Sequence, residues 1–407
     1  MPILGCIADD FTGAGDMASF LAKGGMRTIL YNGVPQSDEP QEEADALVIA
    51  LKTRTQQTQA AVEVSLRALE YLRERGCTHF YIKYCSTFDS TPEGNIGPIC
   101  DAAMEALQVR YTLLCPALPV NGRTVRDGKI YVNGVPLHKS PMKDHPLTPM
   151  WDCDLKKLME PQSKYPVYRI NLAGEAERCT DEHFYLVPDC ENEADLKAIV
   201  DGFGGEILLT GGSGLAVELA RRWMAGREAG TETLTCAATG NALLLAGSCS
   251  QATRGQIDRY RNSGGTCIRL SPDMIMDPNW NVAEFWNDIR QQLRQRCVLV
   301  YTSDTPEQVK QAQRRWGDIS ELLENALASL AELARGDGIN KLIIAGGETS
   351  GAVTRRLGMQ RFYIGQSVAP GVPVMVPLEA KELRLILKSG NFGQPDFFER
   401  AIRQLSQ

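Results

Sequence analysis

The chain has 407 residues, of which 43% are hydrophobic, and a formal net charge of -7. This length exceeds what one hydrophobic core usually holds, so we expect two globular domains. The negative charge argues against nucleic acid or an anionic membrane as the main partner and favours small molecules. Twelve cysteines without a CxxC pair indicate reduced thiols and no zinc site. With no signal-like N-terminus and no apolar run of about 18 residues, we expect a cytoplasmic protein.

The first half of the chain alternates apolar runs with amphipathic patterns, which is typical of a parallel sheet with crossover helices. We expect helices over residues 16–23 and 57–75, and strands over residues 3–8, 28–31, 46–51, 79–84, 111–115 and 207–210. Polar residues follow several of these strands. In α/β sheets, ligands bind beyond the carboxyl ends of the strands, so these polar residues are candidate site residues.

The segment IADDFTGAGDMA, residues 7–18, joins the first expected strand to the first expected helix. Asp9 and Asp10 follow the strand, Thr12 and Gly13 lie in the Gly-rich turn, and Asp16 opens the helix. Glycine allows a close approach of the backbone, the helix start offers free amides to an anion, and the carboxylates bind hydroxyls or a metal ion. We therefore expect Asp9, Thr12 and Gly13 to bind substrate. An ordinary capped βα turn explains the string equally well when it is taken alone.

Basic residues follow two further strands of the first half. Lys52 and Arg54 come after the strand at 46–51, and Lys83 lies at the end of the strand at 79–84. Together they would complement a substrate carboxylate, although a solvated strand end is the simpler interpretation of each. Ser86 and Asp89 lie in the polar stretch after Lys83 and join the candidate residues. Further on, Asn133-Gly134 predicts a β-hairpin.

A polar stretch rich in Gly and Thr ends near residue 240, where we place the domain boundary, giving domains 1–240 and 241–407. The second series of expected strands covers residues 243–246, 266–270, 298–301, 342–345, 372–376 and 385–387. A long helical pattern covers residues 319–335, and Gly336 ends it.

Three loops rich in Gly and Ser follow strands of the second series, in the segments AGSCSQATRGQI, GGETSGAV and LKSGNFG. Such loops present backbone amides and hydroxyls to phosphate. Each loop alone is equally a capped turn, but three in one domain favour a nucleotide site. No loop ends in GK[ST], so the site is not a Walker A motif. The candidate residues are Ser248, Gly346, Gly347, Glu348, Thr349 and Gly390.

Ten ordered segments give the chain a resemblance to the four-carbon acid sugar kinase family over about residues 1 to 400. They are IADDFTGAGDMASFL, IALKTRT, YIKYCSTFDSTPEGNIGPI, CPALPVNGRTV, KSPMKDHPLTPM, LLTGGSGLA, AGSCSQATRGQI, IIAGGETSGAV, APGVPVM and LKSGNFG. The resemblance implies an N-terminal domain for the acid sugar, a C-terminal domain for ATP, and phosphorylation that depends on Mg²⁺. It puts ATP at Ser248, at the run from Gly346 to Thr349, and at Gly390. It puts the acid sugar beside the Asp9-Asp10 loop, Arg54, Lys83 and Asp89.

We therefore expect an α/β protein with two domains, each a mostly parallel sheet flanked by helices, and an active site in the interdomain cleft. The expected reaction moves the γ-phosphoryl group of ATP to the terminal hydroxyl of 3-oxo-tetronate. The expectation of a carbonyl group at C3 of this substrate rests on the resemblance alone. An aspartate would accept the hydroxyl proton, with Asp10 as the first candidate and Asp89 as the second. Metal ligands and a possible homo-oligomer are left open. The alternatives are D-threonate or D-erythronate as substrate, and a non-catalytic sensor of a sugar acid and a nucleotide.

Overall fold

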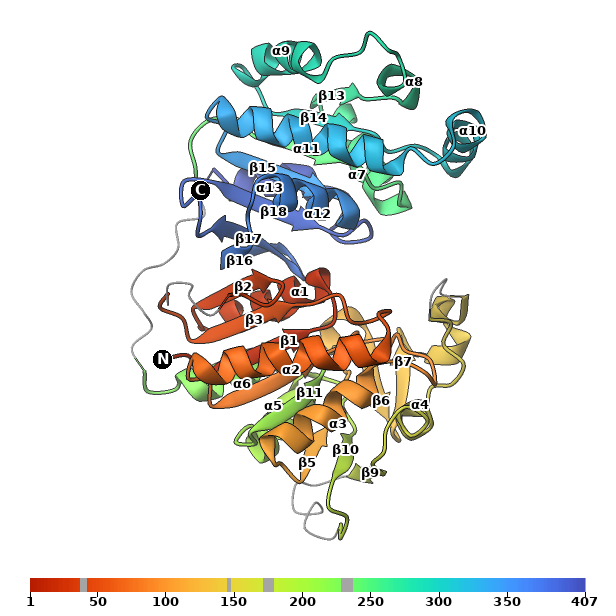
Figure 1. The fold of residues 1–407 in the computed structure, drawn as a ribbon, viewed down its shortest axis with the longest axis vertical. Coiled ribbons are helices and arrows are strands. Elements are labelled where there is room, and N and C mark those ends of the chain that lie inside the picture. Colours follow the sequence, from red (N-terminus) through yellow and green to blue (C-terminus); the bar gives the residue numbers. More distant parts are fainter. Residues whose placement is uncertain (37–41, 145–147, 171–178, 228–236, 407) are drawn as a thin grey trace. The chain divides into compact units, whose positions relative to one another are not determined.

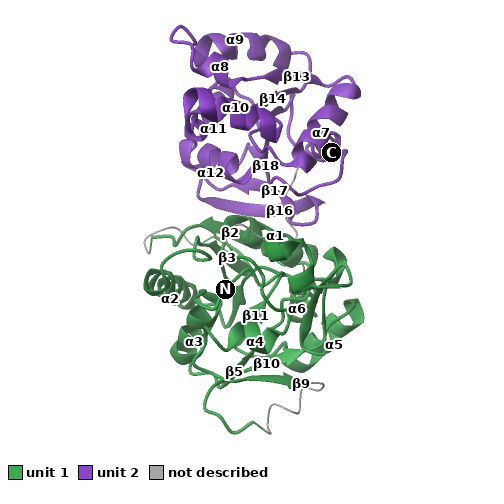
Figure 2. Ribbon diagram, turned by 90° about the vertical axis from the view of Figure 1, so that its right-hand side faces the viewer, with its two compact units in different colours: residues 1–231 green, residues 232–407 purple. Residues whose placement is uncertain are grey.

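The computed structural model describes residues 1–36, 42–144, 148–170, 179–227 and 237–406 (Figure 1). The chain divides into two compact units, residues 1–231 and 232–407 (Figure 2). Each unit has a mainly parallel sheet with helices packed on it, which confirms the expected fold class. The domain boundary expected after residue 240 lies a short way beyond this division. That boundary and the cleft expected between the domains stay predictions.

The main sheet of the first unit is parallel throughout, in the order β11-β4-β1-β3-β2. Its strands are β1 (Leu4–Ala8), β2 (Thr28–Asn32), β3 (Ala46–Ala50), β4 (His79–Lys83) and β11 (Leu208–Gly211). Helix α1 (Phe11–Lys23) packs against α6 (Ala216–Met224), and α2 (Thr58–Glu74) packs against α3 (Ile96–Leu107). Every residue of β1 and β3 is buried, because helices cover a parallel sheet on both faces.

The connections of this sheet reverse direction between two neighbouring strands. β1 leads through α1 to β2, whereas β3, beside it, leads through α2 to β4 on the far side of β1. Ligands of open α/β sheets bind at the carboxyl ends of the strands where such a reversal occurs. The loops after β1 and β3, which contain Asp9, Asp10 and Arg54, lie at this point.

Two smaller sheets complete the first unit. One is parallel, in the order β5-β10-β9, and the other is antiparallel, in the order β6-β7-β8. The expected hairpin is confirmed, with φ of 51° at Asn133 and 79° at Gly134 in its turn. The strands are β5 (Tyr111–Leu113), β6 (Arg123–Arg126), β7 (Lys129–Val132), β8 (Val135–Pro136), β9 (Val167–Ile170) and β10 (Phe184–Pro188). The remaining helices are α4 (Leu155–Met159), α5 (Glu193–Phe203) and the short 3₁₀ turns Pro119–Asn121, Leu137–Lys139 and Pro141–Asp144.

The second unit contains a sheet in the order β16-β17-β18-β15-β12-β14-β13. It is parallel from β18 to β13, and β16, β17 and β18 pair in antiparallel fashion. The strands are β12 (Leu243–Ala246), β13 (Thr266–Arg269), β14 (Val298–Tyr301), β15 (Lys341–Ala345), β16 (Arg361–Ala369), β17 (Val372–Pro377) and β18 (Arg384–Lys388). The helices are α7 (Gln251–Asn262), α8 (Pro272–Ile275), α9 (Val282–Leu293), α10 (Pro306–Trp316), α11 (Ser320–Gly336), α12 (Gly347–Arg356) and α13 (Phe397–Gln404).

This second sheet reverses direction in the same way as the first. β12 leads through α7 to β13, whereas its neighbour β15 leads through α12 to β16 on the opposite side. The core beside these strands contains Leu244, Ile343 and Ile386 from three adjacent strands, together with Phe397 and Phe398 of α13. None of the helices in the described part of the chain combines the length and hydrophobicity needed to cross a bilayer.

Candidate substrate and nucleotide sites

Three carboxylates meet one guanidinium at the carboxyl ends of β1, β3 and β4. Arg54 donates from Nε to Oδ2 of Asp9 at 2.8 Å and from Nη2 to Oδ1 of Asp9 at 3.0 Å. The same Nη2 lies 3.2 Å from Oδ1 of Asp10, and Nη1 lies 3.7 Å from Oδ2 of Asp89. The structure therefore brings these four candidate residues together. It also shows that most of the arginine fork is occupied by carboxylates of this chain.

The two candidate bases of this cluster differ in exposure. Asp10 caps helix α1, since its Oδ1 accepts a hydrogen bond from the amide of Gly13 at 2.7 Å. The Asp10 side chain is 34% exposed, whereas that of Asp89 is 7% exposed. Oδ2 of Asp10 has no hydrogen-bond partner among the described residues, whereas Asp89 accepts from Oγ1 of Thr87 at 2.6 Å. Asp10 thus offers the more accessible carboxylate oxygen.

Lys83 and Gly13 lie beside Asp10. Lys83 ends β4, is 4% exposed, and donates from Nζ to the carbonyl of Tyr84 at 2.9 Å. A Cβ atom on Gly13 would lie 3.0 Å from that Nζ and would collide with Oδ1 of Asp10. Glycine at this position therefore lets the helix begin in contact with both charged groups. Thr12, in the same first turn, is partly exposed.

Asp16, one turn further along α1, is a buried carboxylate of the same region. Its Oδ2 accepts a hydrogen bond from Oγ of Ser213, and its Oδ1 is buried without a partner among the described residues. Burial raises the pKa of Asp16, and the positive charge of Lys83 opposes that shift. The protonated form, when present, gives the buried oxygen a hydrogen to donate.

The loop after β4 holds Asp89 through an unusual backbone conformation. Phe88 has a φ of 51°, which is uncommon for a residue with an aromatic side chain. Its ring is fully buried and lies edge-on to Tyr84, with the ring centroids 5.6 Å apart. This packing fixes the turn that directs Asp89 toward Arg54. Ser86 lies in the same loop and is partly exposed.

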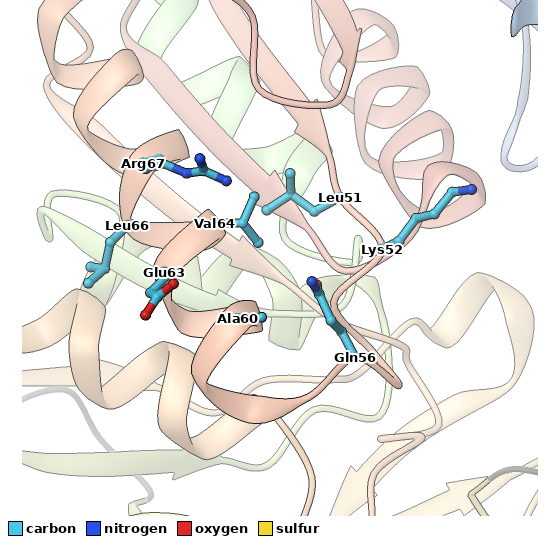
Figure 3. A pocket seen from close by; sticks show the side chains of 8 residues that line it. All are labelled: Leu51, Lys52, Gln56, Ala60, Glu63, Val64, Leu66 and Arg67. Atoms are coloured by element: carbon cyan, nitrogen blue, oxygen red, sulfur yellow. The ribbon is translucent and has the colours of Figure 1, made fainter.

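Cavities of two different sizes lie near these loops in the described part of the first unit. The larger, of about 540 Å³, is lined by Leu51, Lys52 and Gln56 and by side chains of α2, and Figure 3 shows it from close by. Of the basic residues expected at the strand ends, Lys52 lines it, whereas Arg54 and Lys83 do not. The smaller, of about 20 Å³, is lined by Asp9, Arg54, Lys83 and Asp89 among others, and has room for about one water molecule. A four-carbon acid is too large for it.

In the second unit, the loops after β12, β15 and β18 touch one another. The amide of Gly346 donates to the carbonyl of Lys388 at 2.9 Å, and Oγ of Ser250 donates to the carbonyl of Gly390 at 2.7 Å. A Cβ atom on Gly346 would lie 3.1 Å from the amide nitrogen of Ser248, and one on Gly390 would collide with Oγ of Ser248. The candidate nucleotide residues of the three loops are therefore close neighbours.

No side chain caps the N-terminus of α12, and there is free space beside its first residue. Its N-cap, Gly346, has a φ of 138° and no side chain to pair with the first amides of the helix. A Cβ atom on Gly347 would meet nothing within 4 Å, and Glu348 is exposed. Thr349 is 2% exposed and packs against Gly247 and Gly346. Uncapped amides at the positive end of a helix dipole are suited to an anion.

Sequence reasoning missed residues that hold these loops together. Lys388 and Thr253 are buried and hydrogen-bond to each other beside Gly390, and Ser303 donates to the carbonyl of Ser248 at 2.6 Å. Lys388 could have been recognised from its position, because it ends the apolar run RLILK directly before the glycine-rich SGNFG. Cys249, between Ser248 and Ser250, is exposed.

Potential metal ligands gather at one place among the described residues. His138, Asp152 and Cys153 have ligand atoms within 4.8 Å of one another. However, Oδ1 of Asp152 already accepts from the amides of Cys153 and Asp154, and Oδ2 accepts from Nζ of Lys157 at 3.4 Å. A carboxylate that is occupied in this way, beside a lysine, is poorly suited to a cation.

The fold and these two groups of residues define an α/β protein with two units, one with a cluster of charged side chains at its strand ends and the other with three glycine-rich loops in contact. Residues 4–219 match the model of a sugar-binding N-terminal domain, and residues 243–398 match that of a nucleotide-binding C-terminal domain. The chain belongs to the family that these two domains define, the four-carbon acid sugar kinases, which confirms the resemblance.

Known proteins of this family are similar to the chain over its whole length. A 3-oxo-tetronate kinase of Cupriavidus necator is 41% identical over 428 residues, covering 99% of this chain and 97% of the relative. Crystal structures of protein HI1011 of Haemophilus influenzae, family DUF1537, and of a protein from Salmonella typhimurium LT2 have TM-scores of 0.87 and 0.91. Each is 39% identical to the chain, and the alignments cover 99% and 100% of it and all of each solved chain.

Proposed function

We propose that the protein transfers the γ-phosphoryl group of ATP to the terminal hydroxyl of 3-oxo-tetronate. The proposal rests on the similarity to 3-oxo-tetronate kinases, at 40% or 41% identity over nearly the full chain. The charged cluster of the first unit suits a hydroxylated acid, and the loops of the second unit suit a phosphate chain. Phosphoryl transfer depends mainly on alignment of the reactants and neutralisation of charge, which are the properties that these groups offer.

Asp10 is the proposed general base. Its side chain is 34% exposed, and its Oδ2 has no hydrogen-bond partner in the described parts of the chain, so this oxygen is available to the attacking hydroxyl. Asp89 remains the second candidate. Arg54 and Lys83 are proposed to hold the substrate carboxylate, and Nη1 is the part of Arg54 least occupied by Asp9. The pairing with Asp9 fixes the plane of the guanidinium before the substrate arrives.

The second unit is proposed to hold ATP through Ser248, the run from Gly346 to Thr349, and Gly390. Mg²⁺ is expected to arrive with the phosphates, whose charge it would neutralise. Among the described residues of this unit, no three ligand groups gather into a cage. That arrangement fits Mg²⁺, which proteins usually hold through one or two carboxylates plus the substrate phosphates. Glu348, exposed at the start of α12, is the carboxylate that would reach it.

An assay that couples ADP formation to NADH oxidation tests this function. The purified protein would receive ATP, Mg²⁺ and, in turn, 3-oxo-tetronate, D-threonate and D-erythronate, with phosphorus NMR used to identify the phosphorylated product. We expect the highest kcat/KM with the C3 ketone. An equal or higher kcat/KM with D-threonate or D-erythronate would overturn the assignment of the substrate but not that of the kinase activity. No phosphoryl transfer to any acid, in a protein that binds both ligands, would favour a sensor.

We also propose that the protein acts in the cytoplasm. All the cysteines within the described residues are free thiols, and several, such as Cys6, Cys100 and Cys115, are buried in the core. Free thiols in this number are typical of a reducing compartment.

A further inference from the structure

Lys388 is a buried lysine among the three loops of the second unit. It is 1% exposed, and its Nζ donates to Oγ1 of Thr253 at 2.9 Å, to the carbonyl of Gly390 at 3.1 Å and to the carbonyl of Ser389 at 3.3 Å. The ring of Phe397 lies on another side, with its centroid 5.6 Å from Nζ. All three hydrogen-bond partners are uncharged, so the ammonium has no opposite charge beside it.

The elements around Lys388 do not supply that charge. Within the described residues, none of their ionisable side chains forms an ion pair with Lys388. These side chains are Lys341 on β15, Arg384 on β18, Glu348, Arg355 and Arg356 on α12, Arg254, Asp258, Arg259, Tyr260 and Arg261 on α7, and Asp396, Glu399, Arg400 and Arg403 at or on α13. The carboxylates of Asp258 and Glu399 pair instead with Arg261 and Arg259. Strand β17, which also pairs with β18, has no charged residue.

The bonds of Lys388 fix the turn at Gly390 against the start of α7. The carbonyl of Gly390 also accepts from Oγ of Ser250 at 2.7 Å and from Oγ1 of Thr253 at 2.9 Å. A protonated lysine has three donors and no acceptor, which matches its three acceptor partners here. The neutral amine has one donor fewer, so it can donate to only two of these three partners. The ammonium form therefore makes one more hydrogen bond to the turn that contacts Ser248 than the neutral amine does.

We propose that Lys388 is a positioning residue of the nucleotide site, and that the phosphates of the bound nucleotide supply the negative charge that its buried ammonium lacks. This inference rests on the proposed ATP site in the second unit. A nearby anion favours the charged form of a lysine. Nucleotide binding and protonation of Lys388 therefore strengthen each other.

The coupling between nucleotide binding and protonation of Lys388 predicts how the affinity for nucleotide changes with pH. Burial lowers the pKa of Lys388 to about 8. Below that pH the ammonium is already present, and nucleotide binding takes up no proton at this residue. Above it, a growing fraction of the free protein is neutral at Lys388, and binding must take up a proton. The affinity for nucleotide therefore falls as the pH rises through 8, by up to about tenfold for each pH unit.

Calorimetric titration with MgADP at pH 8.5, in buffers that differ in ionisation enthalpy, measures this proton uptake. The Cys249 thiol is exposed between Ser248 and Ser250, so each protein carries Cys249→Ser to remove this thiol from the measurement. We expect this parent to take up roughly 0.5 to 0.8 of a proton. Lys388→Arg, which stays charged, should bind MgADP without uptake. Lys388→Met should bind about tenfold more weakly or worse, also without uptake.

Four results would overturn the inference. The first is an undiminished proton uptake in a folded Lys388→Arg or Lys388→Met protein. The second needs no change at Lys388: a Kd for MgADP that is constant from pH 7 to pH 9.5 in the Cys249→Ser parent. Absence of MgADP binding in the folded parent would overturn both the inference and the proposed nucleotide site. Tight binding with no proton uptake in the parent would overturn the inference alone.

Discussion

Asp10 uses its two carboxylate oxygens for different tasks. Oδ1 accepts a hydrogen bond from the amide of Gly13 and caps α1, whereas Oδ2 is open to the proposed substrate hydroxyl. A substitution at this residue therefore risks confusing a loss of chemistry with a loss of helix stability. Asparagine separates the two, because it is as good an N-cap as aspartate but is not a base at neutral pH.

Asp10→Asn is expected to lower kcat by roughly 10²-fold or more with a modest change in KM. The thermal midpoint should stay near that of the unchanged protein. Asp10→Ala also removes the cap. It should therefore show the same fall in kcat and, in addition, a loss of about 1 kcal/mol in the free energy of unfolding. A rise in KM with unchanged kcat in Asp10→Asn would make Asp10 a binding residue, and Asp89→Asn would then be the variant to measure.

Arg54→Ala is expected to lower kcat/KM for the acid by tenfold or more while the Kd for ATP stays nearly constant. The same change leaves Asp9, whose side chain is 12% exposed, without its bidentate partner. We therefore also expect a loss of roughly 1 to 3 kcal/mol in the free energy of unfolding. Arg54→Lys keeps the charge without the fork and separates the two effects. Wild-type kcat/KM in Arg54→Lys would show that only the charge matters.

Helix α12 combines an N-terminus without a side-chain cap with a glycine at its first position that faces open space. At Gly13 and Gly390 a side chain would collide with this chain's own atoms, but at Gly347 it would not. Gly347 is therefore the position where a larger residue tests the nucleotide site without disturbing the fold.

Gly347→Val is expected to weaken ATP binding by at least tenfold, because the branched side chain would occupy the space proposed for phosphate. Gly336→Val is the matched control, since a Cβ atom there also meets nothing within 4 Å and the residue ends α11. Both variants should unfold near the wild-type temperature. Unchanged calorimetric affinity for ATP in folded Gly347→Val would exclude the start of α12 from the nucleotide site.

The elements that the sequence predicted best are buried strands bounded by loops, such as β1, β3, β12 and β15. Their uninterrupted apolar runs can be recognised from short stretches of sequence. Strand β16 was missed because Gly365, Gln366 and Ser367 interrupt its apolar pattern, where its pairing with β17 also shifts register. Strands β9 and β10 were missed because they are short and lie in a segment where the motifs gave no guidance.

The candidate sites could be predicted as sets of residues but not as networks. Strand ends meet at one sheet edge, so Asp9, Asp10 and Arg54 could be grouped from the sequence. The pairing of Arg54 with Asp9 could not be predicted, because contacts between side chains far apart in the sequence depend on the tertiary structure. The same holds for Lys388, whose partner Thr253 is distant in sequence.

The whole molecule is proposed to keep its two ligands on different units, which predicts separate footprints in hydrogen exchange. MgADP alone should slow exchange in the loops after β12, β15 and β18. The sugar acid alone should slow exchange in the loops after β1, β3 and β4. The reason is that bound ligands suppress the local opening of the loops that hold them. Slower exchange in the first unit with MgADP alone would contradict the assignment of the two ligands to different units.

The exposed position of Cys249 makes it a natural attachment point for a dye. Only the thiolate form reacts quickly with maleimides, and burial raises the pKa of Cys6, Cys85 and Cys115 to about 12. Among the cysteines in the described ranges, Cys249 is the one that solvent reaches freely. A fluorophore attached there would stand between Ser248 and Ser250, so its emission would report the arrival and departure of nucleotide in real time.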